Sequence, residues 1–126
     1  MNLLAVIGAF IMTLAFLSYG IGSITLERFR IIGNMVLIFY SLGLLFEISA
    51  ILMMIIAATG TVETWHMFVG ALAFLIMLIN TVWVWGVYFV KGLDGSVNIW
   101  LLRYTKAAYF CWVVAYLLGI VLIIWF

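Results

Sequence analysis

The sequence predicts an all-α membrane protein, with four transmembrane helices in an up-down bundle and both termini on the non-cytoplasmic side. Three observations lead to this prediction: 71% of the 126 residues are hydrophobic, only 7% are charged, and the basic residues cluster in alternate connections between apolar stretches. A water-soluble fold of this size could not cover so much apolar surface with so few charged side chains. The chain is therefore expected to be a single domain whose solvent is lipid.

Four apolar stretches are long enough for the predicted helices, since a spanning helix needs about 20 mostly apolar residues. They cover about residues 3–22, 31–59, 65–90 and 100–126. The first lacks a basic leader and a small-residue cleavage site, so we expect a retained helix rather than a signal peptide. The second is longer than the bilayer requires and should tilt or project. The segment Gly92–Asn98 contains glycine, Asp and Ser residues that predict a turn between the third and fourth helices.

The basic residues predict the orientation of the bundle. All five lie in or beside the first and third connections: Arg28, Arg30, Lys91, Arg103 and Lys106. The second connection carries only Glu63. Because basic residues favour the cytoplasmic side, the first and third connections are expected there, with Ser23 and Gly95 exposed to it. Aromatic residues near the helix ends, including Tyr19, fit an interfacial belt.

Small residues recur at every fourth position of the last predicted helix: Ala107, Cys111, Ala115 and Gly119. In lipid, helices associate through close packing of such residues, so we expect this strip to face another helix. Cys111 has no partner thiol in the chain. We therefore interpret it as a small packing residue, with a redox role as the alternative.

Glu47 is the most informative residue, because a carboxylate deep in a spanning helix costs several kcal/mol unless it is protonated, paired or hydrated. Its neighbours at three- and four-residue steps are small or polar, which predicts that it points into the bundle. Counted from the outer helix ends, its depth matches that of Thr13 and Tyr116, which are its predicted partners. We expect it to be protonated at neutral pH if no cation accompanies it. A structural hydrogen bond and a proton-carrying or ligand-binding role both remain open.

One face of the third helix carries the only histidine, His66, and an intramembrane amide, Asn80. Their separation of fourteen residues is also the spacing of axial histidines that serve two stacked haems. Here the second position is asparagine, so a bis-histidine haem is impossible within one subunit. A hydrogen-bonding histidine at the membrane boundary, a pH sensor and a ligand contact are the other interpretations of His66.

The remaining residues exclude several classes of function. No nucleophile with a base, phosphate-binding loop, pair of catalytic carboxylates or metal-ligand cluster can be assembled from them. We therefore expect no enzyme activity, no cofactor and no metal. The net charge of +1 argues against nucleic acid as a partner. The expected partners are the lipid bilayer and further membrane subunits, as a homo-oligomer or within a larger complex.

Four motifs in the chain carry a resemblance: Ser18–Gly22, the acidic residue Glu47, His66 with Gly70, and Ala115–Gly119. Together they resemble the HsmA family of small bacterial four-helix membrane proteins. The resemblance implies the four-helix architecture and a multi-pass location in the bacterial inner membrane. Members of that family have Asp in place of Glu47, and histidines in place of Asn80 and Arg103. If those histidines bind haem or a metal, the resemblance implies that this chain has lost that capacity.

Three functions remain open from the sequence. The preferred hypothesis is a non-catalytic membrane bundle that assembles with itself or with a larger membrane complex. The second is a small oligomeric transporter or channel in which the Glu47 carboxyl exchanges a proton or binds a cation. The third is a diverged relative of a b-type haem electron-carrier subunit.

Overall fold

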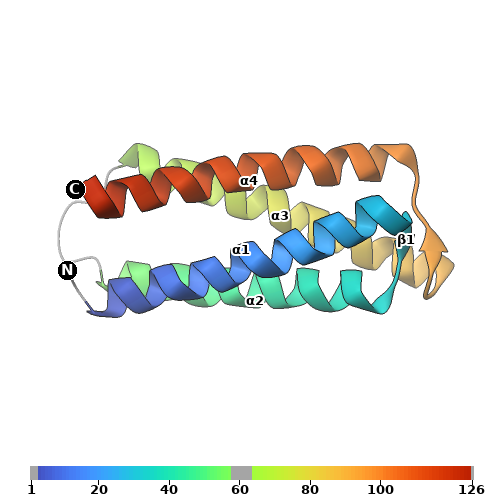
Figure 1. The fold of residues 1–126 in the computed structure, drawn as a ribbon, viewed down its shortest axis with the longest axis horizontal. Helices are drawn as coiled ribbons and strands as arrows, with labels where there is room; N and C mark the ends of the chain where they lie inside the picture. The colour runs from blue at the N-terminus through green and yellow to red at the C-terminus, as the bar shows by residue number, and fades with distance from the viewer. Residues whose placement is uncertain (1–2, 58–63, 126) are drawn as a thin grey trace.

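The computed structural model describes residues 3–57 and 64–125. In these residues the chain forms four helices and two short strands: α1 Leu3–Phe29, β1 Ile31–Ile32, α2 Asn34–Ala57, α3 Thr64–Lys91, β2 Gly95–Ser96 and α4 Ile99–Trp125. The helices lie side by side in an elongated bundle (Figure 1). All four are long and apolar enough to cross a membrane, which fits a multi-pass membrane protein.

The first helix is longer than the hydropathy of the sequence predicts. It continues past Gly22 to Phe29 and ends where Arg30 adopts a φ of 59° and donates its backbone N–H to the Leu26 carbonyl at 2.8 Å. A helix satisfies its own backbone whether its side chains are polar or apolar, so a polar segment does not have to end it. The prediction that Ser23 lies in an exposed connection is therefore wrong, because this side chain is buried within α1.

A two-stranded ribbon joins the two loops at one end of the bundle. Strands β1 and β2 are antiparallel, with Ile31 opposite Ser96 and Ile32 opposite Gly95. The Asp94 N–H donates to the Ile32 carbonyl at 2.8 Å. The turn predicted in the third connection is present, whereas its pairing with the first connection was not predicted. We call this end of the molecule the ribbon end.

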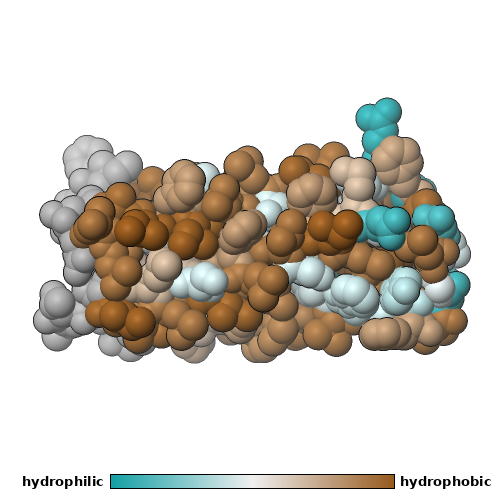
Figure 2. All heavy atoms as spheres, turned by 90° about the horizontal axis from the view of Figure 1, so that it is seen from below, coloured by the Kyte–Doolittle hydropathy of each residue, from teal (hydrophilic) through white to brown (hydrophobic). Residues whose placement is uncertain are grey.

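Charged side chains gather at the ribbon end. Figure 2 shows hydrophilic residues concentrated there, while most of the rest of the visible described surface is apolar. Glu27 and Lys106 form an exposed salt bridge of 3.5 Å, which adds little stability in water. Among the described residues it is the one salt bridge, so the buried Glu47 has no cationic partner there.

The helices share the interior of the bundle unequally. Within an 18-residue apolar stretch of each helix, buried residues make up 39% in α1 and 17% in α4. The largest fully buried side chains include aromatic, aliphatic and amide groups: Tyr19, Leu26, Ile32, Val36, Tyr40, Met77, Asn80, Val84 and Leu101. Of the four helices, α4 therefore has the smallest share of buried residues.

Candidate functional site

Glu47 lies at the centre of the polar interior, with 2% of its surface exposed. The Tyr19 hydroxyl of α1 donates to its Oε1 at 2.7 Å, and the Trp112 Nε1–H of α4 donates to its Oε2 at 2.8 Å. Both carboxyl oxygens are therefore hydrogen-bonded to neutral donors on two other helices. The prediction that Glu47 points into the bundle is confirmed.

A glycine on α2 makes room for this arrangement. Gly43 precedes Glu47 by about one helical turn, and the Tyr19 ring packs against it. A Cβ atom at position 43 would lie 2.6 Å from Cδ1 of Tyr19, which is closer than carbon atoms can approach. The absence of a side chain at Gly43 thus allows the Tyr19 hydroxyl to reach the carboxyl.

The predicted partners of Glu47 were wrong. Thr13 and Tyr116 instead bond to each other, with 2.7 Å between their hydroxyl oxygens. The prediction counted depth from the outer helix ends, whereas the relative heights of α2 and α4 follow from where each helix begins at the ribbon end. Counted from there, Glu47 and Trp112 are each the fourteenth residue of their helix and lie at the same level.

Aromatic rings enclose the carboxyl. The Trp112 ring meets the Tyr19 ring edge-on, with 5.2 Å between centroids, and stacks nearly parallel on Tyr116 at 5.6 Å. Phe16 also stacks on Tyr116, with 5.0 Å between the two ring centroids. Tyr19 therefore belongs to the interior and not to the interfacial belt in which the sequence placed it. Its spacing of four residues from Ser23, on one face of α1, is the signal that could have identified it.

A second polar cluster lies between Glu47 and the ribbon end. The Ser23 and Tyr40 hydroxyl oxygens are 2.7 Å apart, linking α1 and α2. The Thr105 hydroxyl donates to Oδ1 of Asn80 at 3.0 Å, linking α4 and α3. The Tyr40 side chain lies near both Asn80 and Thr105. The sequence singled out Asn80 but not the hydroxyl groups around it.

The Asn80 amide retains an unused donor. Its side chain is fully buried, and within the described residues its Nδ2 has no hydrogen-bond partner. An unsatisfied buried donor is costly in an apolar medium. The cluster around Asn80 is thus polar, enclosed and incompletely bonded.

His66 belongs to α3, but its side chain lies outside what the structure describes. The predicted relation between His66 and Asn80 therefore remains a prediction. In the described part of the chain, no three His, Cys, Asp or Glu side chains come together as a metal-binding group.

The small-residue strip of α4 does not pack inside the bundle along its whole length. Ala107 and Cys111 are exposed, while Ala115 and Gly119 are half-buried. The prediction that all four face another helix is wrong for the first two within one chain. Residues four apart advance by about 40° around an α-helix, so the strip winds from the outer surface toward the interior. The interior face of α4 is formed by Leu101, Thr105, Ala108 and Trp112.

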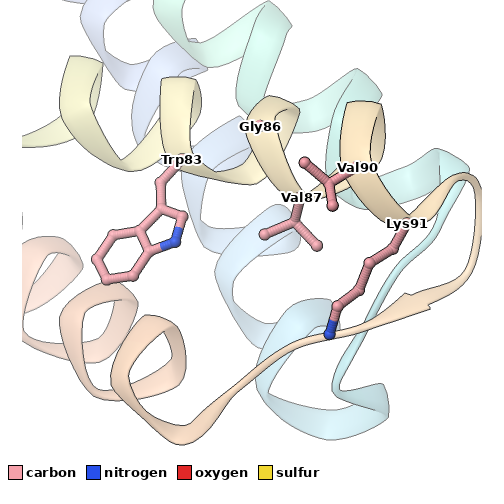
Figure 3. Close-up of a pocket in the computed structure, with 5 residues that line it drawn as sticks. All are labelled: Trp83, Gly86, Val87, Val90 and Lys91. Atoms are coloured by element: carbon pink, nitrogen blue, oxygen red, sulfur yellow. The ribbon is translucent and has the colours of Figure 1, made fainter.

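Two apolar hollows lie on the described surface, and neither is lined by Glu47. One of about 590 Å³ is lined by α2 and α3 residues, including Ser41 and Trp85, which bond to each other at 3.1 Å. The other, of about 370 Å³, is lined by α3 residues alone (Figure 3). Its one charged residue, Lys91, extends toward β2 and donates to the Ser96 carbonyl at 2.9 Å. Neither hollow provides a path to the carboxyl.

Comparisons with protein-family models, with curated proteins and with solved structures find no match for this chain. The resemblance to the HsmA family therefore remains a prediction from the sequence.

Proposed function

We propose that this chain is a non-catalytic integral membrane protein that assembles with a second copy of itself through the outer face of α4. The observation that supports this most directly is the exposure of Ala107 and Cys111 on that face. Small residues four apart let two helix backbones approach closely in lipid. The low share of buried residues in α4 supports the same face, because most of this helix lies outside its own bundle.

The same proposal includes the orientation in the membrane. The helices run alternately up and down, the ribbon end is cytoplasmic, and both termini are on the other side. The support is the position of the basic side chains, which gather at the ribbon end in the described residues.

The absence of catalysis in this proposal rests on how Glu47 is held. Its two oxygens are already bonded to Tyr19 and Trp112, and aromatic rings surround it. Neither of the two hollows described above is lined by it. Neither hollow therefore gives a substrate access to this buried carboxyl.

Oxidative crosslinking of the unmodified protein in native membranes tests the assembly. All copies have the same orientation in a membrane, so a two-fold axis runs perpendicular to it and equivalent residues meet at equal depth. Cys111 should therefore form a disulfide with Cys111 of the second copy. The replacement Ala107→Leu should reduce the yield of crosslinked dimer, because a larger side chain holds the helices apart.

A matched control places the cysteine at the same depth on another helix. In the double variant Cys111→Ser, Ile48→Cys, the thiol lies on the exposed surface of α2, next to Glu47. We expect no crosslinked dimer from it. Equal yields from the two positions would indicate random collision and contradict the proposal, as would a crosslink only to a different protein.

A further inference from the structure

We propose that Glu47 is a proton-exchange site that communicates with only one end of the bundle, the ribbon end, through the Tyr19 hydroxyl. This inference goes beyond self-assembly and does not depend on it. It rests on the kinds of donor that contact the two oxygens of the carboxyl, and on the hydroxyl groups that lie on either side of it.

The Tyr19 side of Glu47 can pass a proton. A phenolic hydroxyl both donates and accepts. In the proposed exchange Tyr19 gives its proton to Oε1, to which it is hydrogen-bonded, while its oxygen takes another from a water molecule on the side facing the ribbon end. Glu47 changes from carboxylate to acid and Tyr19 is unchanged. Release follows the same steps in reverse, and the proton comes from water beyond the ribbon end.

Further hydroxyl groups continue in that direction. Ser23 lies one turn beyond Tyr19 on α1, about 6 Å closer to the ribbon end. Its hydroxyl bonds to that of Tyr40, whose ring centroid is 6.2 Å from that of Tyr19. Both residues are buried, and both have hydroxyls able to donate and to accept. Beside them is the Asn80 amide, with a buried donor that has no partner within the described residues.

The Trp112 side of Glu47 cannot pass a proton. An indole N–H donates but has no lone pair with which to accept, so a relay through Oε2 stops at Trp112. The hydroxyl groups of Thr13 and Tyr116, which lie beyond it, also do not continue a proton path. Thr13 donates its hydrogen to the Ala9 carbonyl at 3.1 Å, so in the Thr13–Tyr116 pair the hydrogen comes from Tyr116. A backbone carbonyl accepts only, and the series ends there.

The titratable side chain that contacts Glu47 is the Tyr19 phenol of α1. Two further phenols lie next to its hydrogen-bond partners, Tyr40 beside Tyr19 and Tyr116 beside Trp112. In the described side chains of α3, the titratable groups are Tyr88 and Lys91, both near the ribbon end. The charged residues around this end are Glu27, Arg28, Arg30, Lys91, Asp94, Arg103 and Lys106. Glu47 is thus the only charged group at its depth among the described residues.

Time-resolved infrared spectroscopy after a pH jump tests the proposal on the full chain reconstituted in lipid. The carbonyl band of the protonated acid is assigned by its loss in Glu47→Gln. The replacement Tyr19→Phe keeps the ring but removes the hydroxyl, and should slow the exchange of this band by roughly a hundredfold.

Two milder replacements keep the test decisive if Tyr19→Phe does not fold. Ser23→Ala, which does not touch Glu47, should also slow exchange, whereas Thr13→Val on the opposite side should not. Slower exchange in Thr13→Val, or unchanged exchange in folded Tyr19→Phe and Ser23→Ala, would overturn the proposal. A carbonyl band that never titrates while the protein remains folded would overturn it as well.

Discussion

Gly43 couples the packing of α1 against α2 to the hydrogen bonding of the buried carboxyl. The Tyr19 ring occupies the space that a side chain at position 43 would need, and it has no room to retreat because it is fully buried against Tyr40 and Trp112. Any side chain at this position must therefore displace Tyr19, and with it the hydroxyl that binds Glu47.

Replacing Gly43 by alanine should lower the free energy of unfolding by about 2 kcal/mol, because overpacking a close contact forces a shift of ring or backbone. Denaturant or thermal unfolding in detergent micelles measures this. Gly86→Ala is the matched control, since a Cβ there meets nothing within 4 Å. The explanation fails if the two variants are equally stable.

The inward direction of Glu47 could be predicted from the small and polar residues on its helical face. Its partners could not, because a depth count is only as accurate as the helix ends from which it starts. The donor properties of Tyr19 and Trp112 were also hidden, since an aromatic residue in a membrane sequence fits an interfacial position as well as an internal one.

At the level of single elements, α4 starts on a side-chain cap. Asn98 Oδ1 accepts the Leu101 backbone N–H at 2.9 Å, which satisfies one of the donors left free in the first turn of a helix. This cap fixes the first residue of α4 next to the ribbon, and so the level at which Trp112 meets Glu47.

Removing the cap with Asn98→Ala should lower the free energy of unfolding by about 1 kcal/mol. The conservative variant Asn98→Asp keeps an acceptor oxygen and should retain most of that stability. Unfolding in the same micelles compares the three proteins. A loss of equal size in both variants would show that the Oδ1 contact is not its cause.

Hydropathy located the four helices but not all of their ends. The second, third and fourth predicted helices begin and end within about three residues of the observed bounds, whereas the first was predicted to end at Gly22 and continues to Phe29. A drop in hydropathy does not by itself end a helix, and α1 continues through the more polar residues after Gly22. The two strands were not predictable, because two-residue strands have no periodicity to detect.

At the level of the whole molecule, the orientation proposed above predicts the labelling of the ribbon end. Asn34 and Leu93 are exposed near the ribbon, so cysteine at either position in a Cys111→Ser background should react only from the cytoplasmic side. An impermeant thiol reagent applied to intact and to permeabilised cells measures this. Glu63→Cys, in the second connection of the sequence, should react in intact cells. The reverse pattern would contradict the orientation.

The ribbon connects two loops that are made at different times during synthesis. The first hairpin, α1 with α2, already contains the Tyr19–Glu47 and Ser23–Tyr40 pairs. Its carboxyl can therefore be bonded inside the membrane before α3 and α4 exist. Strand β1 can pair only after β2 has been translated, and this pairing brings α4 alongside Glu47 at the correct level. The ribbon thus aligns the second hairpin late in biogenesis, on a first hairpin whose buried carboxyl can already be hydrogen-bonded to Tyr19.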